Sequence, residues 1–306
     1  MINRVLIRLK VLQIVYAYYK NSGKSLKAAE DEVFFSLSKA YDLYNYMLLL
    51  IPAITHYAAD RISFLSLKLR PTESDMNPNL KFVNNAFVAQ LQNSEQLNRF
   101  AEKSKLNWVE NSDILRRLLD KIEECDFYKE YMAKENTSYE DDKELWRKIY
   151  KTFIFDNEEL DALLEEQSLY WNDDKSIVDS FVLKTIKRFE PECGDAALLP
   201  EYKDEADRRF ARDLFRNSIA NAEEYRTLMS ESSKNWDMSR LAFMDVIIMQ
   251  VALAEVMTFD DIPLSVTLNE YVEIAKHYST AKSGSFVNGL LDTITKKLRS
   301  EGKIEK

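Results

Sequence analysis

The chain has 306 residues, of which 46% are apolar and 30% are charged, with only five glycines and six prolines. This length can bury a substantial core, and so few glycines and prolines predict long helices with few tight turns. Cys125 and Cys193 are too few for a disulfide framework and show no metal-ligand spacing. They indicate a reducing environment, and we expect the protein to be cytoplasmic.

The formal net charge of −9 argues against general nucleic-acid binding, but the charge is unevenly distributed. Residues 1–30 contain six Lys and Arg and one acid, and residues 263–306 contain seven and five, so the middle carries the acidic excess. Basic ends around an acidic middle are compatible with a local nucleic-acid site. Basic ends that only maintain solubility explain the charge equally well.

We expect neither a targeting segment nor a membrane span. Charged residues interrupt the apolar start of the chain, and no small-residue cleavage site follows it. The uncharged run 43–59 contains polar residues and Pro52, and acids flank it.

Residues 2–20 predict an amphipathic helix whose apolar stripe includes Tyr16. Arg4 and Arg8 lie one turn apart on a neighbouring face. Like charges at this spacing cost a few tenths of a kcal/mol in an isolated helix, so an anionic partner would relieve the repulsion.

The next part of the chain predicts more helices, separated by loops at 70–79 and 190–200. Residues 26–68 predict one or two long helices with a break at Pro52. Further helices are predicted at about 82–103, 108–132, 143–155, 157–170 and 174–189, and a long helical stretch covers 204–236.

A possible internal repeat lies across the second loop. Residues 147–171 align with 212–236 at a constant offset of 65, with eight identities in 25 positions. Helical sequences align by chance easily, so a duplicated helix pair and a chance match both remain open.

Residues 240–258 predict a helix that is apolar almost all round, which is typical of a buried central helix. A second helix follows Pro263, and Thr267-x-x-Glu270 predicts its capping box. A third carries an apolar stripe from Val287 to Leu298. Short loops between the three predict an antiparallel cluster around the first.

The loop Lys282-Ser283-Gly284-Ser285-Phe286 is the best candidate for binding a ligand. It opens a helix, where free backbone N–H groups and the positive end of the dipole suit a phosphate. Gly284 would let a ligand approach the backbone, and Phe286 could stack on an unpaired base. From spacing alone, core packing of Phe286 against Leu290 is favoured, and helix packing explains Gly289.

No catalytic constellation is present in the sequence. His56 and His277 are isolated, and there is no phosphate-binding glycine loop, zinc-ligand set or nucleophile motif. We therefore expect a protein that is not an enzyme and has no cofactor or metal. Glu255, at the end of the apolar helix, is either a solvent edge or a contact with a partner.

Two strings in the C-terminal part resemble a known family. Asn269-Glu270-Tyr-Val-Glu-Ile-Ala-Lys276 and Phe286-Val-Asn-Gly-Leu-Leu-Asp292 are similar to the pattern of NusB transcription antitermination factors. The resemblance implies an all-α, NusB-like antiparallel helical bundle enlarged by an inserted helical block. The bundle would comprise 1–40 plus 204–300, and the insertion would comprise 41–203.

The resemblance also implies a function and its residues. The family binds boxA RNA of nascent ribosomal transcripts together with NusE, and acts indirectly on the RNA polymerase elongation complex. The RNA-binding residues would be Arg4, Arg8, Lys282, Ser283, Gly284, Ser285 and Phe286, and Tyr16 and Glu255 would face NusE. We therefore expect Arg8 and Phe286 to share one surface.

Two alternatives are weighed against this interpretation. The chain could be a protein-binding helical scaffold without RNA specificity, in which the acidic insertion makes the contacts. An RNA-binding domain of a ribosomal RNA methyltransferase is disfavoured because the sequence contains no cofactor-binding α/β half.

Overall fold

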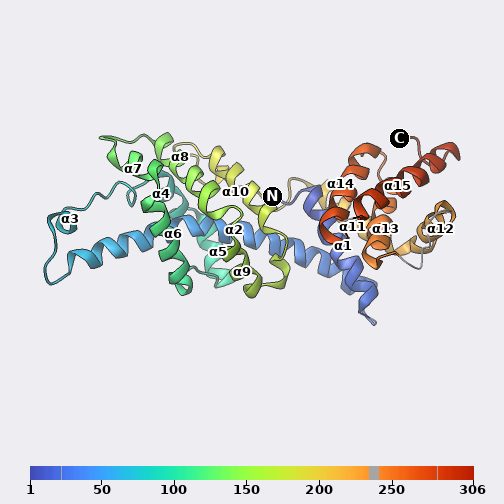
Figure 1. Ribbon diagram of the computed structural model, residues 1–306, viewed down its shortest axis with the longest axis horizontal. Helices are drawn as coiled ribbons and strands as arrows, with labels where there is room; N and C mark the ends of the chain where they lie inside the picture. The colour runs from blue at the N-terminus through green and yellow to red at the C-terminus, as the bar shows by residue number, and fades with distance from the viewer. Residues whose placement is uncertain (22, 234–240, 281) are drawn as a thin grey trace. The chain divides into compact units, whose positions relative to one another are not determined.

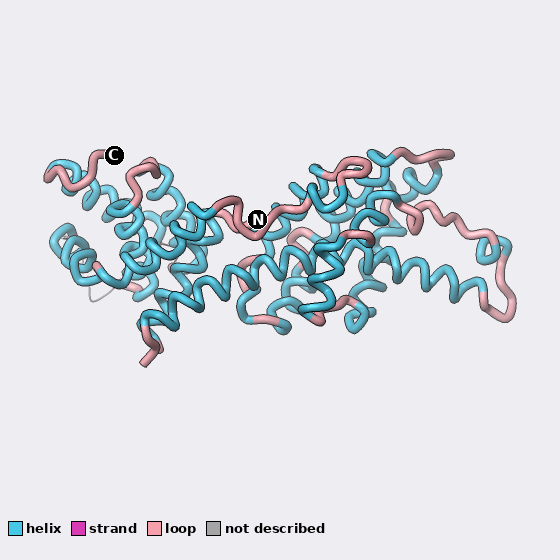
Figure 2. Tube along the Cα trace, turned by 180° about the vertical axis from the view of Figure 1, so that it is seen from behind, coloured by secondary structure: helices cyan, strands magenta, loops and turns pink. Residues whose placement is uncertain are grey.

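The computed structural model describes residues 1–21, 23–233, 241–280 and 282–306. Within these ranges it contains fifteen α-helices and no strand beyond an isolated bridge between Ile2 and Tyr202 (Figures 1 and 2). The predicted all-α fold class is confirmed.

The helices form two compact units. The first comprises Met1 and Ser38–Glu201, and the second comprises Ile2–Leu37 and Tyr202–Lys306. These bounds lie close to the two parts expected from the sequence. The RNA-binding role of one part and the inserted character of the other remain predictions.

The second unit is built around α13 (Phe243–Thr258), which packs against five other helices. Every residue from Ile247 to Val256 is buried, as expected for a helix without a polar face. The helices around it are α1 (Arg4–Lys20), α11 (Glu205–Ala220), α12 (Ala222–Ser232), α14 (Leu264–Tyr278) and α15 (Ser283–Ser300). The first three residues of the predicted helix 240–258 precede α13, and residue 240 lies outside the described ranges.

Side-chain caps fix the starts of two of these helices. Asn3 accepts a hydrogen bond from the Leu6 N–H at the start of α1, and Asp204 does the same for the first turn of α11. The capping box predicted at Thr267 is wrong. Helix α14 already begins after Pro263, and the Thr267 hydroxyl is buried, where it donates to Glu255.

The first unit contains most of α2 (Leu26–Ser66), whose first residues belong to the second unit. Pro52 lies inside α2, so the predicted break is absent. Each of the predicted helices 82–103 and 108–132 is divided in two, by Ser94 and by Cys125. The remaining helices are α3 (Glu73–Met76), α4 (Ala86–Gln92), α5 (Glu95–Ser104), α6 (Ser112–Glu124), α7 (Asp126–Ala133), α8 (Tyr139–Ile149), α9 (Glu158–Gln167) and α10 (Lys175–Arg188).

The two segments of the possible repeat adopt similar local structures. Residues 147–171 include the end of α8, a π-helical turn (Tyr150–Ile154) and α9, whereas the described part of 212–236 comprises α11 and α12. Both members of several aligned pairs are buried: Ile149 and Leu214, Tyr150 and Phe215, Leu160 and Tyr225, Leu164 and Met229. Trp236 lies outside the described residues, and a true duplication remains a prediction.

Candidate nucleic-acid interface

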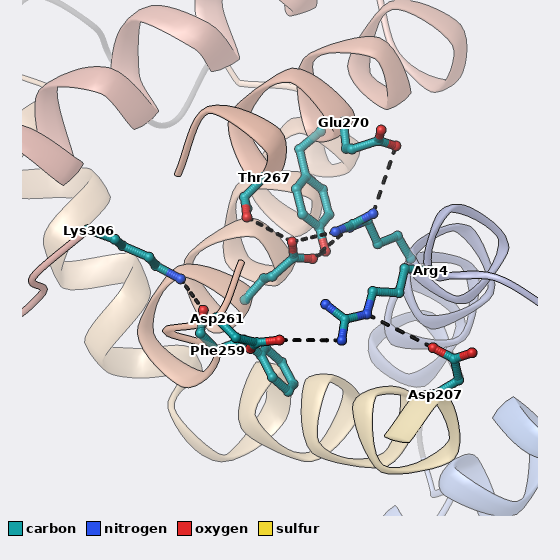
Figure 3. A network of polar contacts seen from close by, with 10 residues as sticks. Arg4, Asp207, Phe259, Asp261, Thr267, Glu270 and Lys306 are labelled. Atoms are coloured by element: carbon teal, nitrogen blue, oxygen red, sulfur yellow. Dashed lines mark hydrogen bonds and ion pairs between the residues drawn. The ribbon is translucent and has the colours of Figure 1, made fainter. Parts of the chain in front are cut away.

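Arg8 of α1 forms a buried ion pair with Glu255 of α13. Its Nε and Nη2 each donate to a different oxygen of Glu255, both at 2.8 Å. The side chains are only 3% and 0% exposed. The hydroxyls of Thr267 and Tyr271 in α14 also donate to this carboxylate, at 2.8 and 3.0 Å (Figure 3). Four donors thus saturate Glu255, which connects three helices.

The electrostatics keep Arg8 charged in this buried position. Burial lowers the pKa of Arg8, but the hydrogen bond and charge of Glu255 outweigh it, and the pKa is raised overall. Burial and the same negative charge raise the pKa of Tyr271 well above its ordinary value, so its hydroxyl stays a donor. Glu270 of the Asn-Glu motif lies 4.0 Å from Arg8 at the edge of the cluster.

This geometry corrects two predicted contacts. The family resemblance implies that Arg8 touches RNA and Glu255 touches a protein partner, but each side chain is buried against the other. Glu255 is therefore not a solvent edge either. The two residues hold α1 against α13 and α14.

Arg4 is the arginine of α1 that reaches the surface, with 37% of its side chain exposed. It lies 3.4 Å from Asp261 and 4.0 Å from Asp207 (Figure 3). Its guanidinium is 5.0 Å from the ring centre of Phe210. An RNA phosphate would have to compete with these carboxylates. Of the two predicted arginine contacts, the structure leaves only Arg4 accessible.

The serine–glycine corner at the start of α15 is largely buried. Ser283 is 1% exposed and donates to Asp245 of α13 at 2.9 Å, while its Oγ accepts from the Thr280 N–H. The buried Asp245 carboxylate adds negative charge beside the helix start, which weakens the attraction for a phosphate there. Lys282 and Ser285 are exposed and remain available to a ligand.

Gly284 and Phe286 serve packing in this structure. A Cβ at Gly284 would lie 2.7 Å from Cγ of Lys276, so the glycine accommodates the side chain of α14, and a ligand does not reach it. Phe286 is 9% exposed, as its spacing with Leu290 predicts, and cannot offer a ring face for stacking without moving. Gly289 behaves in the opposite way, since it is exposed and a Cβ added there would meet no atom within 4 Å. The helix packing expected at Gly289 is therefore wrong.

Tyr16 lies half-buried in an aromatic cluster at the other end of α1. Its ring centre is 5.5 Å from that of Phe243, and the Lys20 ammonium is 4.6 Å from the Phe243 ring. Helix α1 packs against α13. Because Arg8 meets Glu255 and Tyr16 meets Phe243, the two helices run antiparallel.

The expected common surface for Arg8 and Phe286 is not formed. Arg8 is anchored at Glu255 near the end of α13, whereas the corner of α15 is anchored at Asp245 near its start. Ten residues of α-helix separate these anchors, about 15 Å along the axis. The accessible cations Arg4 and Lys282 therefore mark two separate places on the second unit.

Sequence reasoning missed the roles of Thr267 and Tyr271. Both lie on one face of α14 at a spacing of four, opposite a lone carboxylate on an apolar helix. A charge in such a position requires a buried partner and further donors. The lone carboxylate could therefore have predicted hydroxyl donors on the helix that packs against it.

Two features are absent from the described parts of the chain. None of their helices is both long and apolar enough to cross a membrane. The same residues contain no group of three or more His, Cys, Asp or Glu side chains that could hold a metal ion.

The second unit is an all-α bundle in which a buried ion pair and its hydroxyl donors join α1, α13 and α14. A family model described as the NusB family matches residues 180–296. The transcription antitermination protein NusB of Salinibacter ruber (strain DSM 13855 / M31) is 35% identical over 132 residues, covering 41% of this chain and 82% of that relative. The chain belongs to the NusB family.

Two further relatives carry the same name. The protein of Geobacter sulfurreducens is 40% identical over 97 residues, which cover 32% of this chain and 70% of the relative. The protein of Chloroherpeton thalassium is 38% identical over 97 residues, which cover 32% and 46%. No solved structure matches significantly. Relatives named as antitermination proteins support the expectation that the chain is not an enzyme.

The family match differs in extent from the expected one. It begins at residue 180, inside α10, and not at 204. It does not include residues 1–40, of which Ile2–Leu37 belong to the second unit, where α1 packs on α11 and α13.

Proposed function

We propose that this protein is a transcription antitermination factor that binds boxA-type RNA together with NusE during ribosomal RNA transcription. The observation that carries the proposal is the 35% identity to a relative named transcription antitermination protein NusB over 82% of its length. The protein would act on the RNA polymerase elongation complex indirectly, through these two ligands.

The accessible polar residues of the second unit supply the RNA contacts in this proposal. Arg4, Lys282 and Ser285 meet RNA directly, because they are the predicted contacts with exposed or half-exposed side chains. Arg8 acts as a positioning residue, since its pair with Glu255 holds the helix that presents Arg4. Ser283, Gly284 and Phe286 shape the corner that presents Lys282.

The proposed NusE contact is the aromatic cluster at the far end of α1. Tyr16 and Phe243 are partly exposed and lie beside Lys20, so the cluster combines apolar area with a positive charge. Aromatic residues are enriched in protein interfaces for this reason. Two weak sites on one unit give a joint affinity that neither has alone.

The test is a fluorescence anisotropy titration of labelled boxA RNA, with scrambled RNA as competitor and with or without NusE. Arg4→Gln is expected to weaken binding several-fold, and NusE is expected to strengthen binding of the boxA sequence only. Arg99→Gln is the matched control, because Arg99 is a surface arginine of the first unit with 77% of its side chain exposed. Equal binding of scrambled RNA, with no gain from NusE, would favour the protein-scaffold alternative.

A further inference from the structure

Helix α11 carries a stripe of three arginines that the predicted RNA site does not include. Arg208, Arg212 and Arg216 recur every four residues, so they project from one side of the helix about 6 Å apart along its axis. Arg208 and Arg216 are exposed and Arg212 is half-buried. We call these three residues the arginine ridge.

Aromatic rings lie under the ridge. The Arg208 guanidinium is 5.9 Å from the ring centre of Phe34 and 5.3 Å from that of Tyr202, and the Arg212 guanidinium is 5.7 Å from Phe34. Stacking on a ring face restricts a guanidinium while its N–H edge stays open to an acceptor. Arg208 and Arg212 are thus oriented before any ligand arrives.

One buried carboxylate, that of Glu30, contacts two of the three ridge arginines. Glu30 of α2 is 6% exposed; it accepts two hydrogen bonds from Arg216, at 2.6 and 3.0 Å, and lies 3.8 Å from Arg212. The charge of Asp213 also acts on Arg216, so two carboxylates face three guanidinium groups, which leaves an excess of positive charge. Arg208 makes no ion pair with any described residue, so its charge is not compensated locally.

The ridge lies beside the start of α1. Tyr202, under Arg208, bridges to Ile2, and Asp207, next to Arg208 in the chain, pairs with Arg4. Of the acids nearby, Asp204 caps α11 and Asp207 faces Arg4, whereas Glu205 is exposed one turn before Arg208. The uncompensated charge of Arg208 therefore adjoins the one accessible arginine of α1.

We propose that the arginine ridge is a contact surface for the backbone of single-stranded RNA, continuous with Arg4 and separate from the Lys282 corner. The proposal rests on the proposed function only in that this function makes RNA the ligand. Guanidinium groups provide bidentate donors for phosphate oxygens. The guanidinium groups that lie over Phe34 and Tyr202 can themselves stack on nucleobases with their outer faces, which favours RNA over an acidic protein segment.

The test compares the double variant Arg208→Gln/Arg212→Gln with the wild-type chain, using a labelled single-stranded RNA of about 12 nucleotides. A plot of log K against log salt has a negative slope, and each lost phosphate contact reduces the magnitude of this slope by about 0.7 for a single strand. The double variant is therefore expected to reduce the magnitude of this slope by about 1.4 and to weaken binding about tenfold near 0.15 M salt. Circular dichroism checks that the variant is folded.

Two further variants separate recognition from net charge. Arg99→Gln/Arg116→Gln removes the same charge from exposed arginines of the first unit, and is expected to leave the slope unchanged. Arg208→Lys/Arg212→Lys keeps the charge but removes the planar fork, and is expected to keep the slope while binding more weakly.

The outcomes distinguish this proposal from the proposed function. If Arg208→Gln/Arg212→Gln leaves slope and affinity unchanged while the wild type binds boxA RNA, the ridge does not contact RNA. The proposed function would then still stand. Loss of binding in that variant without any boxA preference in the wild type would support the ridge and overturn the proposed function. Wild-type protein that binds poly-glutamate as tightly as RNA would assign the ridge to an acidic protein partner and overturn the proposal.

Discussion

A buried arginine stabilises a fold only while its carboxylate partner remains in place. Arg8 and Glu255 are 3% and 0% exposed and meet through two hydrogen bonds of 2.8 Å. The hydroxyls of Thr267 and Tyr271 complete the set around the carboxylate. Removing either charged group leaves the other buried without its partner.

The first prediction is a double-mutant cycle on this pair. Arg8→Met and Glu255→Leu are each expected to lower the free energy of unfolding by about 3–5 kcal/mol, because each strands a buried charge. The double variant should lower the free energy of unfolding by only about 1–3 kcal/mol, mainly because the hydroxyls of Thr267 and Tyr271 lose their acceptor. Urea unfolding followed by circular dichroism measures the three values. A double variant that loses the sum of the single effects would contradict a coupled pair.

At this scale the sequence is informative about residue types and less so about their partners. The apolar pattern of α13 correctly predicts a central helix, and the spacing of Phe286 correctly predicts its burial. Arg8 and Arg4 have the same spacing pattern, yet one is buried and the other half-exposed. The difference arises because Glu255, distant in sequence, packs against one of them, and helical periodicity does not encode that contact.

The two glycines of α15 illustrate what sets the requirements of a helix. Gly284 lies under the Lys276 side chain of α14, with its missing Cβ position 2.7 Å from Cγ. Gly289 is five residues further along the same helix, is exposed, and has no neighbour within 4 Å of that position. One glycine permits close packing of two helices, and the other leaves an open place on the surface.

The second prediction uses these glycines as a matched pair. Gly284→Ala is expected to lower the free energy of unfolding by about 1–3 kcal/mol, because the added methyl group overpacks the contact with α14. Gly289→Ala is expected to raise it by about 0.5–1 kcal/mol, because alanine favours the helix and meets no obstacle. Thermal and urea unfolding compare both variants with the wild type. Effects of the same sign would show that contact with Lys276 does not decide the outcome.

The positions of helices are more predictable than their ends. Periodicity locates α1, α13, α14 and α15, because each has one apolar face or is apolar throughout. The predicted start of α14 is misplaced because Thr267 and Glu270 imitate a capping box, whereas Pro263 and burial of the Thr267 hydroxyl decide the boundary. Pro52 does not end α2, so a proline rule alone also fails.

At the scale of the whole molecule, the first unit contains a second buried charge cluster. Asp179 of α10 is fully buried, accepts from Tyr150 at 2.6 Å and pairs with Lys175 at 2.7 Å. Burial raises the pKa of Asp179 to about 6 from an ordinary 3.8, against the opposing effect of Lys175. The folded state therefore holds this proton over a pH range in which the unfolded chain releases it.

The third prediction follows from that raised pKa. Between about pH 4 and pH 6 the folded state binds more protons than the unfolded state, so Asp179 makes stability fall as pH rises, by up to about 3 kcal/mol. Asp179→Asn removes this titration. The unfolding free energy of the wild type should therefore decline relative to the variant across this range. Urea titrations at several pH values, followed by fluorescence of Trp108, Trp146 and Trp171, measure it. An unfolding free energy of the wild type that stays constant or rises relative to that of Asp179→Asn over this pH range would contradict the raised pKa.

The second unit is assembled from the two ends of the polypeptide, and this order matters during synthesis. Arg8 leaves the ribosome 247 residues before Glu255. At about 5–20 residues per second, the interval lasts roughly 12–50 s. During that time α1 exposes an apolar stripe, and its arginine remains hydrated with no carboxylate to meet. We therefore expect the apolar stripe of α1 to stay uncovered in the nascent chain until α13 and α14 have emerged.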